Sequence, residues 1–349
     1  MHKHGGDIYQ KDALIDFSAN INLMGISESV VSAACEGVRL SANYPDVECR
    51  ELRKSISESI EVPMDHVICG NGAADIIYSM VLALKPKKAL LPVPSFYEYE
   101  KALSILDCEL EYFPLREENQ FLLQEDFLSS ITEDIDMIFL CNPNNPTGNL
   151  TDKQLMDQIL QKCEELAIWL VVDECFLDFV EEGKDFSVLG RIEHAKYLMV
   201  LKAFTKLYAM PGLRLGYGIT SNREFLAQMR EVSQPWNVSI PAQLAGIAAL
   251  KEVEYVKTSL ETMKRERHYL VDELNKLGFR VFGSKANYIF FQAVVGLTSY
   301  CFERGILIRD CSNYRGLGEG YYRIAVRTHH ENIQLTQVLK EAVNEWQKQ

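Results

Sequence analysis

Three charged side chains stand where a ligand could reach them, at or beyond short apolar runs. Asp173 directly follows the run AIWLVV (167–172), Lys206 comes shortly after YLMVL (197–201), and Arg214 lies further along the chain. A lysine amine can form a Schiff base with an aldehyde, and the planar fork of an arginine can bind a phosphate. A carboxylate at the end of a buried strand needs a cationic partner, such as a protonated pyridinium nitrogen. These residue types indicate a site for a phosphorylated pyridine ring that carries an aldehyde.

Other residues suited to such a ring follow the remaining apolar runs. Gly72 lies in a glycine turn that opens a helical pattern, where backbone N–H groups can approach an anion. Phe96 could stack on a planar ring, and Asn145, in the turn CNPNNPTG (141–148), could donate to a phenolic oxygen. Each residue has an ordinary alternative, such as a plain turn, a core aromatic residue, a structural ion pair or a solvated lysine. Because five successive strand ends supply parts that suit one ring, their coincidence favours the site.

Alternating strands and helices must bring these residues together. Short apolar runs alternate with segments of helical spacing, such as Ile76 to Leu84. This pattern predicts an α/β fold with a largely parallel sheet that is covered by helices on both faces. Ligands of such sheets bind beyond the carboxyl ends of the strands, where the residues above stand. The predicted strands are HVIC (66–69), KALL (88–91), DMIFL (136–140), AIWLVV (167–172), YLMVL (197–201) and YGI (217–219).

The C-terminal part of the chain predicts a separate, smaller unit. Beyond Pro241 a long charged helical stretch runs to about Leu277, followed by the strand candidates FRVF, YIFF, ILIR and YYRIAV and a helix over 330–348. We expect the first 40 or so residues to pack near the junction and against this unit. The chain is therefore predicted to have a large domain over 41–250 and a small α+β domain built from 1–40 and 251–349.

Charge and composition exclude several classes of partner. The formal net charge of −13 disfavours non-specific binding to nucleic acid or anionic membranes, and we expect neither as a partner. The nine cysteines lack metal-ligand spacing, and two histidines near a terminus, His2 and His4, are more often solvated than metal-bound, so we assign no metal. Because neither a secretory signal nor a membrane-spanning run stands out, we expect a cytoplasmic protein with reduced thiols.

The chain resembles the fold-type I pyridoxal-phosphate (PLP) enzymes, the aspartate aminotransferase-like superfamily, through the motifs NPNNPTG (142–148), VVDE (171–174) and FTK…PGLRLGY (204–217). The resemblance covers essentially the whole length and implies PLP as cofactor, a mixed, mostly parallel sheet and a homodimer with active sites at the subunit interface. Lys206 would hold PLP as a Schiff base and Asp173 would bind its pyridinium nitrogen, which makes both catalytic. The other cofactor-binding residues that the resemblance implies are Asn71, Gly72 and Ala73 at the phosphate, Phe96 on the ring, Asn145 at O3′, Thr205, Arg214 at the phosphate, and Tyr44, which would reach the neighbouring subunit's cofactor phosphate.

Within this superfamily the chain is similar to two families that act on phosphorylated amines. The segments HGGD (4–7) and DFSANIN (16–22) resemble the opening of the L-threonine-O-3-phosphate decarboxylases of cobalamin synthesis, as do LIRDCSNY (307–314) and RIAVR (323–327). The histidinol-phosphate aminotransferases are the second family, and they usually have a tyrosine where this chain has Phe176. The substrate-binding residues that the first resemblance implies are His4, Asn22, Arg309 and Arg323.

These resemblances leave two reactions and one non-catalytic role to compare. The bond at the substrate Cα that lies perpendicular to the ring is the one that breaks, so the placement of Arg309 and Arg323 decides the reaction. We expect decarboxylation of phosphothreonine to aminopropanol phosphate, with transamination of histidinol phosphate or an aromatic amino acid as the alternative. A PLP-binding regulatory protein without turnover is the third reading, and the acidic charge argues against its usual DNA-binding partner module.

Overall fold

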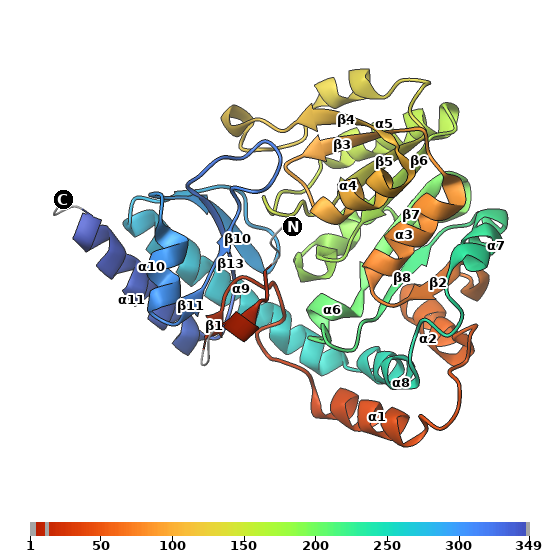
Figure 1. Ribbon diagram of the computed structural model, residues 1–349, viewed down its shortest axis with the longest axis horizontal. Coiled ribbons are helices and arrows are strands. Elements are labelled where there is room, and N and C mark those ends of the chain that lie inside the picture. The colour runs from red at the N-terminus through yellow and green to blue at the C-terminus, as the bar shows by residue number, and fades with distance from the viewer. Residues whose placement is uncertain (1–4, 11–13, 347–349) are drawn as a thin grey trace.

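The computed structural model describes residues 5–10 and 14–346, which form a large and a small unit side by side (Figure 1). The large unit is built on a seven-stranded sheet with the order β2-β8-β7-β6-β5-β3-β4. Strand β8 runs antiparallel to β2 and β7, while the other neighbouring strands are parallel, so the expected mixed, mostly parallel sheet is confirmed. The strands of this sheet are β2 (Val67–Gly70), β3 (Lys88–Val93), β4 (Glu109–Pro114), β5 (Met137–Cys141), β6 (Trp169–Asp173), β7 (Leu198–Ala203) and β8 (Gly216–Ile219).

Helices cover both faces of this sheet, as the alternating pattern predicted. Apolar side chains of α3, α4 and α7 bury one face, and those of α2, α5 and α8 bury the other. Each helix turns its apolar stripe to the sheet, as Ile76, Ile77 and Met80 do on α3. The helices of the large unit, with the one-turn helix α6, are α2 (Arg50–Ile60), α3 (Ala73–Leu84), α4 (Tyr97–Leu103), α5 (Lys153–Glu165), α6 (Phe204–Leu207), α7 (Arg223–Val232) and α8 (Ile240–Ala249).

Strand β4 is the element of this sheet that the sequence analysis did not predict. It lies at the sheet edge beside β3, and its residues are half-buried or exposed. An edge strand of this kind needs no continuous apolar run, so the sequence ELEYFP carries a weak signal.

Short 3₁₀ helices complete the connections at Ile8–Gln10, Met64–His66, Ser104–Leu106, Glu117–Asn119, Glu125–Ser130, Leu177–Phe179, Gly183–Phe186 and Leu189–His194.

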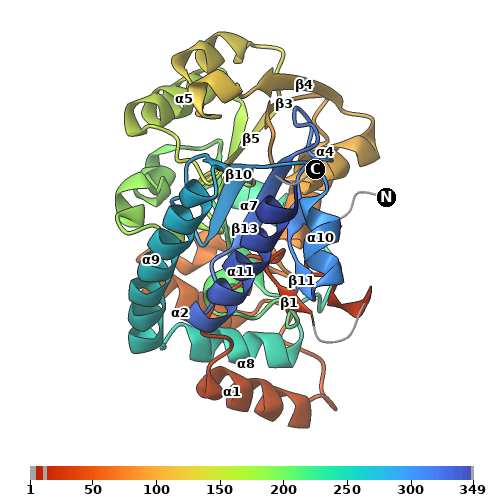
Figure 2. The ribbon, with the colours of Figure 1, turned by 90° about the vertical axis from the view of Figure 1, so that its left-hand side faces the viewer.

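The small unit packs three helices against a four-stranded antiparallel sheet with the order β12-β13-β10-β9 (Figure 2). Most of its core is a cluster of apolar residues to which these helices and strands contribute, with Leu270, Ile289 and Leu335 among those fully buried. The strands are β9 (Arg280–Val281), β10 (Tyr288–Gln292), β12 (Arg309–Asp310) and β13 (Tyr321–Ala325), and the helices are α9 (Val253–Lys276), α10 (Leu297–Glu303) and α11 (His329–Trp346).

The described residues among the first 40 divide between the two units. Strand β1 (Ile15–Asp16) pairs in parallel with β11 (Ile306–Leu307), beside the small unit's core. Helix α1 (Glu28–Arg39) instead lies against α8 (Figures 1 and 2), where a Cβ on Gly37 would be 2.5 Å from the Pro241 Cα. The division at residue 41 stays a prediction, and the packing of α1 favours a boundary that precedes this helix.

Candidate active site

Lys206 lies on α6, the single helical turn that follows β7, where its side chain is half-buried. Its Nζ is 5.4 Å from the ring centroid of Phe176. Burial lowers the pKa of Lys206 from 10.5 to about 8, and the positive charges of Arg323 and Arg214 act in the same direction. A lysine with this pKa is partly neutral near neutral pH, which is the form that attacks an aldehyde.

Asp173 ends β6, between β5 and β7, and its side chain is 6% exposed. Its carboxylate accepts hydrogen bonds from the Cys175 backbone N–H at 2.9 Å and from the Tyr99 hydroxyl at 2.6 Å. Burial, followed by the charge of Asp173, raises the pKa of Tyr99, so this phenol stays protonated and donates. Within the described residues no cationic side chain forms an ion pair with Asp173. A buried carboxylate held only by neutral donors fits a protonated ring nitrogen as its counter-charge.

The N-terminus of α3 forms an anion cradle. Gly72 precedes this helix with a φ of 86° and no side-chain cap, so no side chain of Gly72 occupies the positive helix end, where the first N–H groups can bind an anion. A Cβ on Gly72 would lie 2.5 Å from Nη2 of Arg214, so the guanidinium sits directly against this turn. Asn71 lies at the same turn and is exposed, with its backbone N–H bound to the Asp75 carboxylate at 2.8 Å. The arrangement suits a phosphate group.

We expect Gly72→Ala to weaken PLP binding to the apoprotein by about tenfold or more, because a Cβ both opposes the positive φ and displaces Arg214. Titration of the apoprotein with PLP, followed by absorbance, measures this affinity. Gly190→Ala is the matched control, because a Cβ there would have no neighbour within 4 Å. Equal PLP affinities of the two variants would contradict the cradle.

Asn145 is fixed by two donors at its side-chain oxygen. Oδ1 accepts hydrogen bonds from Nη1 of Arg323 and from the Tyr314 hydroxyl, the latter at 3.3 Å. This arrangement sets which way the amide faces and leaves its nitrogen as the donor. Among the described residues the side-chain nitrogen of Asn145 has no hydrogen-bond partner. It is therefore suited to donate to the phenolic oxygen of a bound ring.

These residues meet in a cavity of about 150 Å³. Phe96, which precedes α4, contributes one aromatic wall and lies edge-on to Tyr99 with 5.5 Å between ring centroids. The cavity thus joins a reactive amine, a buried carboxylate, an amide donor and an anion cradle, and these fit PLP. The residues that line it are Ala73, Ala74, Ile77, Phe96, Cys141, Asn145, Asp173, Cys175, Phe176, Ala203, Thr205, Lys206 and Arg214.

The predicted substrate-binding arginines lie beside this cavity. Arg309 on β12 and Arg323 on β13 are Cα partners in the antiparallel ladder and are 6% and 5% exposed. Arg323 donates to the Ser18 carbonyl at 2.9 Å, and its Nε is buried without a partner among the described residues. Arg309 donates to the Asp310 carbonyl at 2.6 Å and to Asn313 Oδ1 at 2.8 Å.

Two of the remaining predicted residues are placed differently. Tyr44 is 78% exposed, stacks on Trp236 with 4.6 Å between ring centroids, and is not among the residues that line the cavity. Asn22 uses its side-chain amide to donate to the Leu207 carbonyl at 2.7 Å, while its Oδ1 accepts from the backbone of Met24. It therefore supports the α6 turn instead of facing a ligand. His4 lies outside the described residues.

Asn20 is a candidate that the sequence analysis missed. Its side chain is 2% exposed, and its Oδ1 has no partner among the described residues. It lies between Ser18, which binds Arg323, and Asn22, whose N–H donates to the Lys206 carbonyl at 3.1 Å. A buried, unpaired polar atom beside the two groups that define the site points to a ligand contact. The segment SANIN (18–22) contains both asparagines, and no signal in the sequence distinguishes the directions of their side chains.

We expect Asn20→Ala to weaken substrate binding and Asn22→Ala to lower thermal stability. Loss of the Asn20 side chain, whose Oδ1 is unpaired, should raise the substrate KM about tenfold with little change in Tm, whereas loss of the Asn22 bond to the backbone should lower Tm by several degrees. Steady-state kinetics and thermal unfolding of both variants give the comparison. The assignment is wrong if Asn20→Ala loses stability and keeps its KM.

Two further features bear on the class of protein. In the described part of the chain, no group of three or more His, Cys, Asp and Glu residues is arranged to hold a metal ion. None of the helices that the structure describes is both long and apolar enough to span a membrane.

Comparison with known proteins adds independent findings. The chain matches the family described as aminotransferase class I and II over residues 12–341. It is 34% identical to the threonine-phosphate decarboxylase of Salmonella typhimurium, over 97% of this chain and 95% of that protein. It is 29% identical to the histidinol-phosphate aminotransferase of Methanosphaera stadtmanae, over 95% of this chain and 91% of that protein. The solved histidinol-phosphate aminotransferase from Clostridium acetobutylicum is 34% identical, with a TM-score of 0.89 over 95% of this chain and 100% of that chain.

Proposed function

Because the chain belongs to the class I and II aminotransferase family, a family of PLP-dependent enzymes, we propose that it decarboxylates L-threonine O-3-phosphate to (R)-1-aminopropan-2-yl phosphate. PLP is its cofactor. The proposal agrees with its similarity to the Salmonella typhimurium protein over nearly the full length of both chains. Phe176, which lies near Lys206 where the aminotransferases usually have a tyrosine, favours the same reaction.

The pairing of Arg309 with Arg323 is the observation that carries this proposal. Like charges on directly opposed strand residues destabilise a sheet, and buried charges without counter-ions cost more still. In the described residues neither arginine pairs with a carboxylate, although both are almost completely buried. A substrate with two anionic groups, a carboxylate and a phosphate, would supply both missing counter-charges.

The residues of this chain have distinct roles in such a reaction. When bound, PLP supplies an electron sink that stabilises negative charge at the substrate Cα. Lys206, with its lowered pKa, holds the cofactor and moves a proton at that carbon, while Asp173 holds a proton on the ring nitrogen. Arg323 and Arg309 would bind the anionic groups and so fix the orientation of the substrate carboxylate. Phe96 and Phe176 exclude water from the cavity.

The test is to supply the PLP-loaded protein with phosphothreonine and no oxo acid. Release of carbon dioxide and aminopropanol phosphate in equal amounts is the expected result. The alternative is a histidinol-phosphate aminotransferase, which the similarity to the solved Clostridium acetobutylicum enzyme favours. Glutamate formation that requires both histidinol phosphate and 2-oxoglutarate would support that alternative and overturn the decarboxylase. Absence of turnover with either substrate, while the lysine-bound cofactor is present, would support a regulatory role.

We also propose that the protein is a homodimer in which the partner's Tyr44 completes each cofactor site. Tyr44 and Trp236 form an exposed aromatic pair, and Val38, Leu40 and Val47 add exposed apolar side chains from the same stretch of chain. Clustered exposed apolar residues of this kind are typical of subunit interfaces. Sedimentation velocity should give a dimer, and Tyr44→Ala should lower the affinity for PLP.

A further inference from the structure

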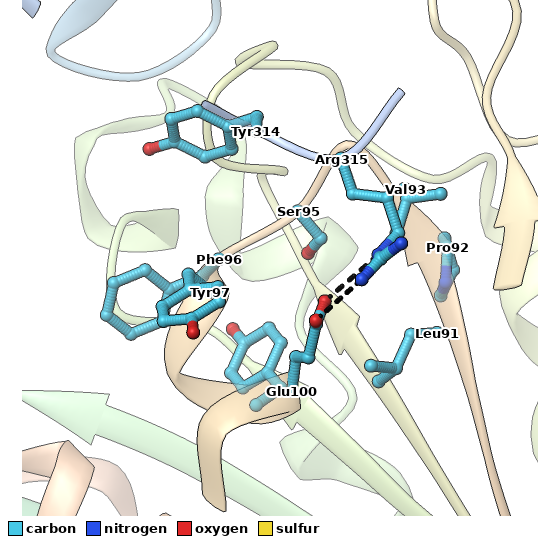
Figure 3. A pocket seen from close by; sticks show the side chains of 10 residues that line it. Leu91, Pro92, Val93, Ser95, Phe96, Tyr97, Glu100, Tyr314 and Arg315 are labelled. Atoms are coloured by element: carbon cyan, nitrogen blue, oxygen red, sulfur yellow. Dashed lines mark hydrogen bonds and ion pairs between the residues drawn. The ribbon is translucent and has the colours of Figure 1, made fainter. Parts of the chain in front are cut away.

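The loop between β12 and β13 reaches from the small unit to the large one. Arg315 on this loop forms a two-pronged ion pair with Glu100 of α4, with Nε–Oε2 at 3.1 Å and Nη2–Oε1 at 2.7 Å (Figure 3). Its guanidinium also lies 4.1 Å from the ring centroid of Tyr112 on β4. The hydrogen bonds with Glu100 raise the pKa of Arg315, so this guanidinium stays charged. The loop is therefore tied to two elements of the large unit.

The residue before this arginine contacts Asn145, which lines the active-site cavity. Tyr314 is 6% exposed, and its hydroxyl contacts Asn145 Oδ1 at 3.3 Å and Nη1 of Arg323 at 3.4 Å. A hydroxyl can donate to the first and accept from the second, so it joins the O3′ donor to the substrate arginine. The guanidinium of Arg309 lies 5.1 Å from the centre of the Tyr314 ring. Tyr314 thus contacts both candidate substrate arginines and Asn145.

Gly316, the residue after Arg315, lies where the loop packs against the end of β3, which leads to Phe96. Gly316 has a φ of 85°, and a Cβ there would lie 3.7 Å from the Val93 carbonyl. Pro94, Ser95 and Phe96 follow, and Ser95, Phe96 and Tyr314 line a small pocket (Figure 3), of which Phe96 also lines the cofactor cavity. The ring of Tyr314 also belongs to a cluster with aromatic residues of both units, among them Phe121 and Phe290. The loop is consequently a junction between the substrate side and the cofactor side.

We propose that Tyr314 is a positioning residue for the proposed reaction and that the Arg315–Glu100 pair is a clasp that keeps it in place. The hydroxyl fixes the amide of Asn145 and the guanidinium of Arg323, so that the cofactor oxygen and the substrate carboxylate meet donors already oriented. A partly exposed ion pair usually adds little to overall stability. The Arg315–Glu100 pair has bidentate geometry and ties a loop of one unit to the other. Its loss is therefore expected to loosen the loop that carries Tyr314. The proposal rests on the proposed function for its substrate.

Tyr314→Phe tests the positioning role, because it keeps the ring and removes only the hydroxyl. We expect the KM for phosphothreonine to rise about tenfold while kcat changes less than about twofold. The PLP-loaded protein gives a second readout that needs no turnover. A hydrogen bond donated to the ionised ring oxygen favours its charged form, so a misaligned Asn145 should move the pH midpoint of the visible absorbance change upward. An unchanged KM with an unchanged midpoint would overturn the positioning role.

Charge reversal tests the clasp. Arg315→Glu and Glu100→Arg alone should each raise KM about threefold and speed amide hydrogen exchange across residues 311–319 of the apoprotein, and the double variant should restore both. Arg191→Glu is the matched control, since Arg191 forms a similar two-pronged pair with Asp157 at the surface, with Nε–Oδ1 at 3.1 Å and Nη2–Oδ2 at 2.9 Å. It should leave KM and loop exchange unchanged. The clasp would be overturned if the single variants kept the KM and loop exchange of the wild type, as this control should. It would also be overturned if the double variant failed to restore them. If the wild type fails to turn over phosphothreonine, the proposed function fails, and the exchange and absorbance measurements still decide the clasp.

Discussion

Replacement of Lys206 by alanine is expected to abolish the visible absorbance of lysine-bound PLP and to lower turnover by about 10³-fold or more. Lys206 is the amine in the cavity that lies between the anion cradle and Asp173, and it serves both in cofactor attachment and in proton transfer at the substrate Cα. Lys202→Ala is an informative comparison, because Lys202 lies near the same strand end but pairs with Asp178 at 2.7 Å. Survival of the absorbance in Lys206→Ala would remove the central assignment.

The lowered pKa of Lys206 adds a pH dependence to this prediction. An ordinary lysine is almost fully protonated at neutral pH, whereas a pKa of about 8 leaves roughly a tenth of the side chain neutral at pH 7. The rate at which PLP attaches to the apoprotein should therefore rise about tenfold per pH unit below 8 and level off above it. Stopped-flow absorbance after mixing with PLP measures this rate. A rise that continued to pH 10 would mean that Lys206 has an ordinary pKa.

Asp173→Asn is expected to lower turnover by roughly 10²- to 10³-fold while PLP still binds. The amide keeps the shape of the side chain and removes the negative charge that would hold a proton on the ring nitrogen. Tyr99→Phe should have a smaller effect, of about tenfold, because it removes one donor from a carboxylate that keeps the Cys175 N–H.

The control for this prediction is Asp178→Asn. Asp178 is also a carboxylate of this region, but it pairs with Lys202 and does not line the cavity. Its turnover should stay within about twofold of the wild type. Comparable losses in both variants would show that the effect of Asp173→Asn comes from a general change in packing and not from the ring nitrogen.

The cofactor side of the site could be predicted from sequence because its residues lie at strand ends or shortly after them. Asp173 ends β6, while Lys206 and Asn145 follow β7 and β5, and these three strands are neighbours in the sheet. The carboxyl ends of parallel strands lie at one edge of the sheet. Residues at the ends of neighbouring parallel strands therefore lie close together in space. The apolar runs are long enough to mark these strands without any structural information.

The residues that the sequence did not reveal depend on side-chain directions and on packing between units. Tyr99 reaches Asp173 from the helix after Phe96, and Tyr314 reaches Asn145 from a loop of the other unit. Asn20 and Asn22 differ only in the direction of their side chains within an irregular segment, which no periodicity specifies. Helix α1 is amphipathic and could have packed on either unit, so its position beside α8 was equally open.

The pairing of β1 with β11 has a consequence for the order in which the site is made. Residues 15–16 find their partners at residues 306–307, and Arg323 binds the carbonyl of Ser18. A chain that leaves the ribosome N-terminus first exposes the phosphate cradle, Asp173 and Lys206 well before either substrate arginine has been synthesised. Contacts between such distant segments also form late in folding. A nascent chain is thus expected to become competent for its cofactor first and to acquire its selectivity for a substrate only when the two ends of the polypeptide meet.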